Sequence, residues 1–483
     1  MRGGMRRRPW RRGNRTSAAR GAPQPLDRGV LGTCVDRRTM LRITGGAAVV
    51  LPLAACGDAD AAPNTLRISY QQFGSGTIMR DYLTGVMEAY STRHPDVTVE
   101  LVPLVAAEED YFTKNELMMS SPRTTPDLVY EDTFILQSDV AAGYLRPIDD
   151  YIAGWDNWEH FYEPGKEAVT GQNGKVYAVP THTDTRGLWY NQDLFEQAGL
   201  SVPWRPSTWT DILDAMRTLK DELPEVIPIN VYSGKPQGEK ASMQGFEMLL
   251  YGTDDRLYDA ESETWVLGSQ GFLDSLEFLR TIFSERLTPG IGQALDPNLS
   301  ELVQNTWMPE GRVAVNLDGS WISSSWVEGG AAEWPEWPDV IDVAPMPTQD
   351  GSAPGVVSLA GGWSWAIPQL SSKPDLAWSF LEEMMSTDNM AGLAVADNQV
   401  TIRSDVADHP DYQGYSPTID FFTELVDKAE YRPALAPYPQ VSAAIQAAME
   451  TVMTGQGTPE QAQAAYDADV RDIVGPENTS EAS

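Results

Sequence analysis

The strongest constraint on the fold is an alternation of strand-like and helix-like patterns over residues 66–130. Leu66–Tyr70 alternates apolar and polar residues, which is the spacing of a strand. Apolar residues then recur at helical spacing over residues 79–90, and two further strand-like runs follow at 97–101 and 126–130. Strands that alternate with helices favour a parallel sheet covered on both faces, so we predict an α/β fold.

Ligands of such sheets bind beyond the carboxyl ends of the strands. Gln72 and Phe73 follow the first strand, and Glu131 and Asp132 end the third. We therefore expect these four side chains to face a ligand. The alternative for Glu131 and Asp132 is that they cap the next helix, which begins at Thr133.

The second half of the chain contains further helix signals. Thr208 and Asp211 have the spacing of a capping box, and apolar residues recur at helical spacing over residues 272–283. The Ala-rich run at 441–454 predicts another helix. Thr458 followed by proline predicts the start of the last one.

Length and charge limit the class of protein. The chain has 483 residues, of which 42% are apolar. Single cores stop growing beyond about 250–300 residues, so we expect two lobes. Residues 1–55 carry 12 Arg and 2 Asp, a net charge of +10, whereas the remaining 23 basic and 67 acidic side chains give −44. A body this acidic is repelled by nucleic acid, so we expect no nucleic-acid partner.

Cysteine and histidine usage excludes several kinds of site. The sequence has two cysteines, Cys34 and Cys56, and four histidines without metal-ligand spacing. If Cys34 is removed with an export signal, neither an internal disulfide nor a cysteine-based metal site can form. The sequence also lacks GxSxG, HExxH and P-loop motifs. We therefore expect no metal, no cofactor and no enzyme activity.

Residues 1–55 have the composition and order of an export signal. The run Asp36-Arg37-Arg38-Thr39-Met40-Leu41-Arg42 resembles a twin-arginine motif. The apolar stretch 43–53 is too short to span a bilayer and has the length of a signal-peptide core. It ends in Leu53-Ala54-Ala55-Cys56, which resembles a lipobox, the motif whose cysteine is lipidated and becomes the new N-terminus.

We therefore expect Cys56 to anchor the protein in the membrane, with residues 56–63 as a tether. The alternative is a short buried helix with an ordinary free cysteine. Arginine pairs also occur in general export signals, so the sequence does not decide between export by the twin-arginine route and export by the general route. No other stretch has 18 consecutive apolar residues, so we expect the body to lie outside the bilayer.

A series of short motifs carries a wider similarity. The motifs are Gly174-Lys175-Val176-Tyr177-Ala178-Val179-Pro180, Leu188-Trp189-Tyr190-Asn191-Gln192-Asp193-Leu194-Phe195, Ser207-Thr208-Trp209-Thr210-Asp211, Glu310-Gly311-Arg312-Val313-Ala314-Val315, Gly319-Ser320-Trp321 and Gly361-Gly362-Trp363-Ser364-Trp365-Ala366-Ile367. In this order and at these separations they resemble the extracellular solute-binding protein family 1 of ABC importers, the sugar- and maltodextrin-binding type. The resemblance covers residues 64–475.

The resemblance implies a two-lobed, periplasmic-binding-protein-like (type II) α/β fold, with a hinge between lobes that close over a ligand. It implies chain crossings near residues 177–181, 312–317 and 362–367. The expected division is a first lobe at 64–178 and 315–362, a second lobe at 181–312 and 366–475, and a tail at 476–483. The implied function is that of a monomeric lipoprotein that captures a sugar or polyol outside the membrane and delivers it to the permease subunits of an ABC importer.

A sugar has hydroxyl groups and apolar C–H faces, so its site needs carboxylates or amides together with aromatic rings. Trp321 follows a Gly-Ser turn, and Trp363 follows Gly362, where the backbone can approach a ligand closely. Asp184 lies just past the first crossing, where the resemblance implies a ligand-facing acid. We also place Arg403 at the rim of the second lobe.

Each candidate has a structural alternative. A tryptophan in a chain this size is usually a core residue, Asp184 could pair with Arg186, and Arg403 could form a surface ion pair. We expect Trp334 and Trp337, which lie beside prolines, to pack within loops.

Two other functions remain open. A secreted glycoside hydrolase could use Glu131 with Asp132, or Asp254 with Asp255, as acid and base. Adjacent residues of a strand point to opposite faces, which argues against both pairs. A lipid-anchored sensor or adhesion module is the second alternative.

The ligand itself is also left open among sugars, polyols and glycerol-phosphate derivatives. The acidic body argues against a phosphorylated ligand. Glu131, at a position where some relatives carry an aromatic residue, argues against a long maltodextrin.

Overall fold

The computed structural model describes residues 64–72, 75–106 and 108–482. The predicted export signal (residues 1–55), Cys56 and the tether lie outside these residues, as does Phe73. None of the helices in the described ranges combines the length and the apolar character that crossing a membrane requires.

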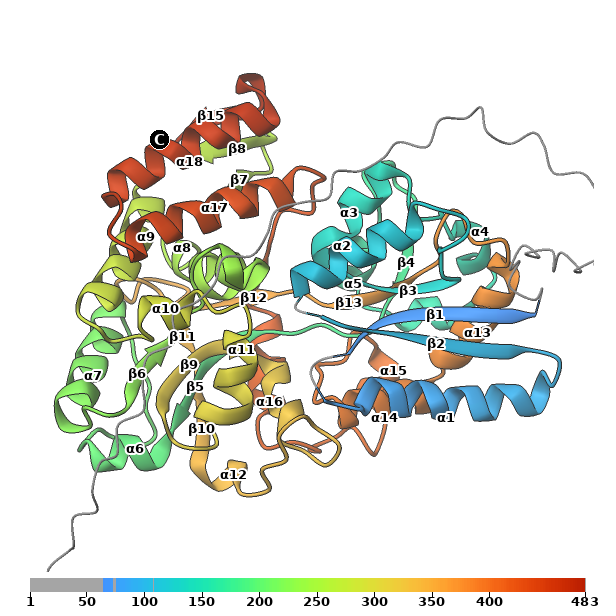
Figure 1. Cartoon of the computed structure of the whole chain (residues 1–483), viewed down its shortest axis with the longest axis horizontal. Helices are drawn as coiled ribbons and strands as arrows, with labels where there is room; N and C mark the ends of the chain where they lie inside the picture. Colours follow the sequence, from blue (N-terminus) through green and yellow to red (C-terminus); the bar gives the residue numbers. More distant parts are fainter. Residues whose placement is uncertain (1–63, 73–74, 107, 483) are drawn as a thin grey trace, which may run out of the picture. The chain divides into compact units, whose positions relative to one another are not determined.

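The expected strands form the core of a five-stranded sheet (Figure 1). Its order is β2-β1-β3-β13-β4, with β1 (Thr65–Gln72), β2 (Thr98–Val105), β3 (Leu128–Asp132), β4 (Ala178–Pro180) and β13 (Trp363–Ala366). Strand β1 pairs in parallel with β2 and with β3, as predicted. Strand β13 is antiparallel to both β3 and β4, so the sheet is mixed. The α/β prediction is confirmed, and the late strand β13 lies at the centre of an early sheet.

A second large sheet has four strands in the order β10-β5-β9-β6. Its strands are β5 (Arg186–Asn191), β6 (Ile227–Asn230), β9 (Val313–Gly319) and β10 (Ile341–Ala344). Strand β9 is buried along its whole length, pairing antiparallel with β5 and parallel with β6. Two small sheets complete the described part, β11 (Met346–Pro347) with β12 (Val356–Ala360) and β14 (Ala429–Tyr431), and β7 (Tyr258–Asp259) with β8 (Thr264–Leu267) and β15 (Thr479–Glu481).

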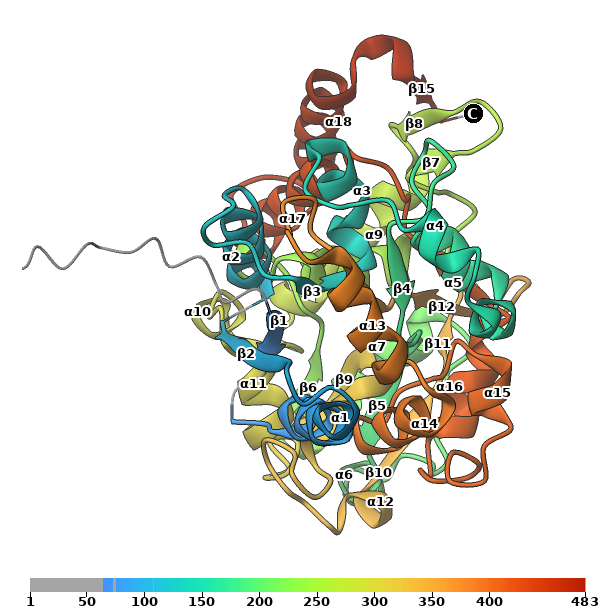
Figure 2. The same ribbon diagram turned by 90° about the vertical axis from the view of Figure 1, so that its right-hand side faces the viewer.

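Helices cover both faces of the five-stranded sheet. Helices α2 and α3 lie on one side, and α1 and α14 lie on the other (Figures 1 and 2). The longer helices are α1 (Ile78–Arg93), α2 (Glu108–Met119), α3 (Thr133–Ala142), α7 (Trp209–Glu222), α9 (Gln270–Ser284), α13 (Pro374–Met384), α14 (Thr387–Ala396), α16 (Ile419–Val426), α17 (Tyr438–Met453) and α18 (Pro459–Val474).

Shorter helical segments connect these elements. They are α4 (Asp149–Ile152), η1 (Asp156–His160), α5 (Glu163–Ala168), α6 (Gln192–Gln197), η2 (Lys235–Gln237), η3 (Ala241–Glu247), α8 (Met248–Leu250), α10 (Ile291–Ala294), α11 (Leu299–Leu302), η4 (Val303–Trp307), η5 (Ser320–Ser325), α12 (Trp337–Val340), α15 (Ser404–Ala407) and η6 (Pro476–Asn478). Segments η3 and η4 are π-helical.

The predicted helix starts are present. Thr208 caps α7, and its hydroxyl and the Asp211 carboxylate form the expected capping box. Thr458 caps α18 in the same way, with proline at the first helical position. Such caps satisfy backbone N–H groups that have no partner inside the helix, which is why they mark a helix start in the sequence.

Three chain segments lie side by side near the two large sheets. One joins β4 of the five-stranded sheet to β5 of the four-stranded sheet, one joins β12 of a small sheet to β13 of the five-stranded sheet, and the third follows α14. Isolated bridges pair Thr183 with Val400 and Asp184 with Gly361, so the three segments are hydrogen-bonded side by side. The Thr183 amide donates to the Val400 carbonyl at 2.9 Å. The first and second segments lie near two of the expected crossings.

The strand pairing differs from the expected division at residues 312–344. Strand β9, expected at a crossing into the first lobe, pairs within the four-stranded sheet, and β10 does too. Side chains also fix β9 there, because Asn230 Nδ2 donates to Asn316 Oδ1 at 2.8 Å. Conversely, α13 and α14, expected in the second lobe, pack against α1. A buried apolar run predicts a strand but not the sheet in which that strand pairs, so the pattern could not place β9.

Residues 476–483, expected to be a tail, contain the strand β15. It pairs in parallel with β8, with Thr479 opposite Trp265. The Ala482 amide also donates to the Leu267 carbonyl at 2.8 Å. Strand β15 lies at the edge of a small sheet, where a strand can be short and polar. The run Thr479–Glu481 therefore has no apolar alternation from which a strand could be predicted.

Candidate ligand-binding site

A cavity of about 500 Å³ lies between residues of the two large sheets. Tyr70, Tyr130 and Trp363 line it from the five-stranded sheet, and Glu239 and Trp321 line it from segments that follow β6 and β9. Its volume is within the range of sites for small molecules, roughly 300–1,000 Å³. The carboxyl ends of β1 and β3 reach this cavity, which is where ligands of α/β sheets bind.

Aromatic rings form part of the cavity wall. Trp363 stacks on Tyr130, with ring centroids 4.9 Å apart and planes inclined by 21°. Trp321 is half-buried, and the Arg186 guanidinium covers one of its faces, with Cζ 4.8 Å from the ring centroid. Both predicted tryptophans therefore line the cavity, and their contact with a ligand stays a prediction.

Gly362 acts differently from our expectation. Its φ is +143°, and a Cβ there would lie 2.3 Å from the backbone oxygen of His182. Gly362 is buried where the segment entering β13 passes the segment leaving β4, and the Thr133 amide donates to its carbonyl at 3.1 Å. The close approach that requires glycine is thus between two chain segments, and Gly362 is not among the residues that line the cavity.

Asp184 lines the cavity and is also an ion-pair partner. It is 4% exposed, and Arg186 Nη1 pairs with its Oδ1. The same oxygen accepts a hydrogen bond from the Gly361 amide at 2.8 Å, and Arg186 Nη1 donates to the Leu359 carbonyl at 3.1 Å. The alternative interpretation of Asp184 as a partner of Arg186 is therefore correct, and its place in the cavity wall keeps the ligand prediction open.

His182 adjoins this pair in the cavity wall. Burial lowers the pKa of His182 to about 4, a shift that the nearby charge of Asp184 opposes. Its imidazole is therefore neutral at physiological pH. His182 Nδ1 lies 2.9 Å from the Thr181 hydroxyl, within hydrogen-bonding distance.

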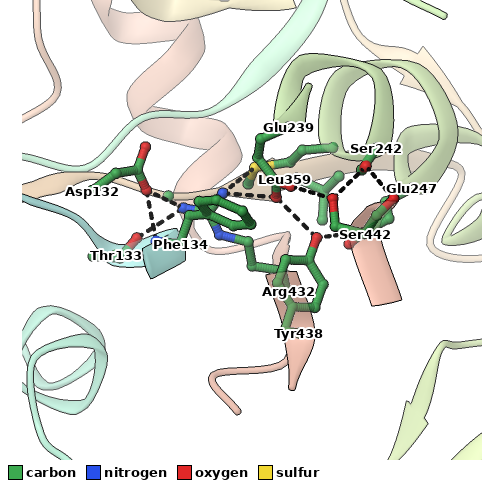
Figure 3. A network of polar contacts seen from close by, with 12 residues as sticks. Asp132, Thr133, Phe134, Glu239, Ser242, Glu247, Leu359, Arg432, Tyr438 and Ser442 are labelled. Carbon is green, nitrogen blue, oxygen red and sulfur yellow. Dashed lines mark hydrogen bonds and ion pairs between the residues drawn. The ribbon is translucent and has the colours of Figure 1, made fainter. Parts of the chain in front are cut away.

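Asp132 belongs to a buried network that crosses the cavity wall (Figure 3). It caps α3, because its Oδ1 accepts a hydrogen bond from the Phe134 amide at 2.7 Å. Arg432 pairs with Asp132 through Nη2, which also donates to the Thr133 hydroxyl at 3.0 Å. Through Nη1, Arg432 pairs with Glu239 at 3.0 Å. Asp132 thus caps the helix, as the alternative proposed, and also lines the cavity, where its contact with a ligand stays a prediction.

The remaining predicted residues fall into two groups. Gln72 lines the cavity. Glu131 is 1% exposed, is not among the lining residues, and accepts a hydrogen bond from Asn115 Nδ2 at 3.5 Å. Arg403 is fully buried and pairs with Asp405 at 2.6 Å, away from the cavity. The position of Arg403 is therefore neither a rim nor a surface ion pair.

Several buried polar atoms of the lining residues have no hydrogen-bond partner within the described part of the chain. They are Tyr70 Oη, Gln71 Oε1, Arg186 Nε, Asn305 Oδ1 and Gln399 Oε1. A buried polar group without a partner costs about 1–3 kcal/mol. Two of the amide orientations are fixed by their nitrogen atoms, because Gln399 Nε2 donates to Asp397 Oδ2 at 3.1 Å and Gln71 Nε2 donates to the Ala106 carbonyl at 3.4 Å. These atoms require donors and acceptors that a bound molecule can supply.

Sequence reasoning missed His182, Glu239 and Arg432 as cavity residues. Glu239 had no clear signal, because it lies in the polar run Gln237-Gly238-Glu239-Lys240, which has the composition of a surface loop. Arg432 had no local signal, because its partners Asp132 and Glu239 are distant in the chain. Among the described residues, no cluster of His, Cys, Asp or Glu is arranged to hold a metal ion.

Named proteins are similar in sequence to this chain over most of its length. Residues 76–391 match the family of bacterial extracellular solute-binding proteins. A binding protein of Brucella abortus is 24% identical over 418 residues, which cover 85% of this chain and 92% of that protein. The lactose-binding protein of Rhizobium radiobacter is 23% identical over 306 residues, or 62% of this chain and 66% of that protein.

Solved structures share the fold. The GacH receptor of Streptomyces glaucescens, studied unliganded and with acarbose, superposes with a TM-score of 0.72 at 22% identity, covering 85% of this chain and 98% of that one. A solute-binding protein of Thermotoga lettingae bound to α-D-tagatose gives 0.73 at 24% identity, covering 85% and 99%. The expected two-lobed fold is thus confirmed. Because the family match spans well over half of the sequence, this chain belongs to the bacterial extracellular solute-binding proteins.

Proposed function

We propose that the protein binds a sugar or polyol in the cavity between its two large sheets and delivers it to the permease of an ABC importer. The observation that carries this proposal is the cavity wall itself. It combines stacked aromatic rings, such as Trp363 on Tyr130, with buried polar atoms that have no partner within the described residues. A sugar matches both, because its C–H faces stack on rings and its hydroxyls donate and accept hydrogen bonds.

The names of the relatives support the same ligand class. The Rhizobium relative is named for lactose, and the Thermotoga structure holds tagatose. Within the site, we propose stacking on Trp321 and Trp363 and polar contacts from Gln72, Asp132 and Asp184. The side-chain amide oxygens of Gln71, Asn305 and Gln399 have no hydrogen-bond partner among the described residues, and as acceptors they favour a ligand rich in hydroxyl donors.

We also propose that the site performs no catalysis. Glycoside hydrolysis requires two carboxyl groups, one of them protonated and free to reach the leaving group. The pair suggested by the sequence, Glu131 with Asp132, does not meet this requirement, because Asp132 is paired with Arg432 and Glu131 is not a lining residue. Asp255 Oδ2 accepts a hydrogen bond from the Gly271 amide at 2.6 Å, outside the cavity. The named relatives are likewise binding proteins.

For location, we propose the outer face of the cytoplasmic membrane, with the protein anchored as a monomer by lipid on Cys56. The lipobox-like Leu53-Ala54-Ala55-Cys56 and the family's extracellular character support this.

A thermal-shift screen of neutral sugars, polyols and sugar phosphates tests the proposed ligand class. A ligand at one hundred times its dissociation constant should stabilise the protein by about 2.7 kcal/mol. Stabilisation by a neutral sugar or polyol, with the ligand recovered unchanged, is the expected result. A screen in which only phosphorylated compounds stabilise, or in which the ligand is turned over, contradicts the proposal.

A further inference from the structure

Arg432 connects the two walls of the cavity. Its Nη2 contacts Asp132 and Thr133, at the end of β3 in the five-stranded sheet, and its Nη1 contacts Glu239, in the segment that follows β6. Its Cζ also lies 5.4 Å from the Phe134 ring centroid. Glu239 is the contact of this arginine on the wall opposite the five-stranded sheet. The position of Arg432 therefore depends in part on how firmly the Glu239 carboxylate is held.

Glu239 is held by a second set of groups. Its Oε1 accepts hydrogen bonds from Arg432 and, at 2.9 Å, from the Tyr438 hydroxyl. Its Oε2 accepts from the Ser442 hydroxyl at 2.6 Å. The Tyr438 oxygen also contacts Oε1 of a second carboxyl group, that of Glu247 (Figure 3).

The Tyr438 hydroxyl has one proton for two carboxyl groups. If Tyr438 donates that proton to Glu239, its contact with Glu247 needs a proton from Glu247. If both carboxyl groups were ionised, one of the two close oxygen–oxygen contacts would lack a proton, and two like charges would lie on one hydroxyl. The geometry is satisfied when Glu247 donates to Tyr438 and Tyr438 donates to Glu239.

We propose that Glu247 is protonated in the folded protein and that, through Tyr438 and Glu239, it is a positioning residue for Arg432 in the cavity wall. The proton on Glu247 lets Tyr438 donate to Glu239, and Glu239 then holds the arginine. When Glu247 ionises, the Tyr438 proton is shared between two carboxylates, and Arg432 loses a fixed partner.

The surroundings of Glu247 favour its neutral form. The titratable groups that face it are Glu239, Tyr251, Arg432, Tyr438 and Tyr466. Burial, followed by the negative charge of Glu239, raises the pKa of Glu247 to about 8, while Tyr438, Arg432 and Tyr251 oppose the shift. Strand β9 also packs on η3. Its acid, Asp318, accepts hydrogen bonds from Tyr232, Asn316, Gln304 and the Gly319 amide rather than from Glu247.

Substitutions of Glu247 in the full chain, without any ligand, test the proposal. Glu247→Gln keeps an N–H donor for Tyr438 but cannot titrate, whereas Glu247→Ala removes the donor. The pKa of Glu247 is raised from 4.5 to about 8 on folding. The wild-type protein therefore loses stability relative to Glu247→Gln as the pH rises through this window. We expect the melting temperature of Glu247→Gln minus that of wild type to increase by about 2 °C or more between pH 5 and pH 8. Glu247→Ala should be less stable than Glu247→Gln at both pH 5 and pH 8.

The positioning role has its own readout, the side-chain Nε–H resonance of Arg432 in nitrogen-15-labelled protein, assigned with Arg432→Lys. It should shift between pH 6 and pH 9 in wild type and stay constant in Glu247→Gln. A resonance that is constant in wild type, or that shifts equally in both proteins, overturns the proposal.

If Glu247→Gln does not fold, infrared spectroscopy of wild type decides. A protonated-carboxyl band that disappears towards pH 9, and that persists in the double variant Glu131→Gln/Asp139→Asn, supports the proposal, because burial raises the pKa of both of those other acids. The absence of the band from that double variant overturns the proposal. Because no ligand is used, either result leaves the proposed sugar binding to its own test.

Discussion

Arg186 lies over one face of Trp321, with its guanidinium carbon 4.8 Å from the ring centroid, and pairs with Asp184 through the same guanidinium. One arginine thus orients both the ring and the acid that the sequence suggested as ligand contacts. The covered face of Trp321 is closed to a ligand, so stacking can take place only on the other face. Because Arg186 contacts both groups, we expect substitution of Asp184 to displace the Trp321 ring as well.

Replacing Trp321 by alanine should weaken sugar binding by about ten- to a hundredfold, because the stacking surface is lost. The check is a calorimetric titration with a sugar found by the thermal-shift screen. Trp334→Ala is the matched control, since Trp334 packs against Trp326 with centroids 5.4 Å apart and does not line the cavity. Equal affinities for the two variants would place the sugar elsewhere.

Replacing Asp184 by alanine should destabilise the folded protein by about 3–5 kcal/mol, because Arg186 is left buried without its carboxylate. Denaturant unfolding measures the change. Asp184→Asn, which keeps an acceptor oxygen, should lose less. The control is Glu163→Ala at the exposed pair with Lys166, where about 1 kcal/mol or less is expected. If Asp184→Ala is as stable as the control, the buried pair does not support the fold.

Replacing Gly362 by alanine should destabilise the protein by at least about 1–3 kcal/mol, because φ is +143° and the new Cβ would meet the His182 backbone oxygen at 2.3 Å. Gly392 in α14 is the control, since a Cβ there meets nothing within 4 Å. Gly392→Ala should be neutral or stabilise by up to about 1 kcal/mol through helix propensity. Thermal unfolding of both variants compares them, and a stable Gly362→Ala would mean that the crossing segments separate easily.

Replacing Asp139 by asparagine should stabilise the protein at pH 8. Burial, followed by the charge of Glu116, raises the pKa of Asp139 from 3.8 to about 8, and neither of its carboxyl oxygens has a partner within the described residues. Because the folded state keeps this proton to a higher pH than the unfolded state does, the wild-type protein loses stability as the pH rises from about 4 to about 8. Asp139→Asn lacks that loss. Its free energy of unfolding should therefore exceed that of wild type by more than about 1 kcal/mol at pH 8, and by less at pH 4.5. An advantage that is independent of pH contradicts the assignment.

Replacing Cys56 by alanine should release the protein from the membrane fraction of its host. Stable attachment requires two acyl chains, which the expected modification of the cysteine supplies. Fractionation followed by a carbonate wash checks this, with Cys34→Ala as the control that should stay attached. A Cys56→Ala protein that remains in the washed membranes rules out the lipid anchor.

The sequence predicted individual strands and helix starts better than it predicted which strands pair with one another. Strands β1, β2 and β3 and the capping boxes of α7 and α18 follow from local spacing, because each depends on residues a few positions apart. The sheet in which β9 pairs was not predictable, because pairing is decided by contacts with β6 and β5, which lie 86 or more residues earlier in the chain.

The same distinction applies to the site. Asp132, Trp321 and Trp363 were predicted from a strand end and from glycine-containing turns, Asp184 was implied by the family resemblance, and all four line the cavity. Arg432 was missed because its partners, Asp132 and Glu239, are about 300 and 190 residues away. Glu131 was misplaced because alternation along β3 sends neighbouring side chains to opposite faces, and only the neighbour Asp132 faces the cavity.

The bridges that join Thr183 to Val400 and Asp184 to Gly361 limit how the protein can open. Three independent linkers would let the two large sheets twist and slide as well as swing apart. Three segments bonded to one another behave as a ribbon, which bends easily about one line across its width and resists the other motions. We therefore expect the two large sheets to separate by rotation about a single axis, with the two walls of the cavity returning to the same register on closure.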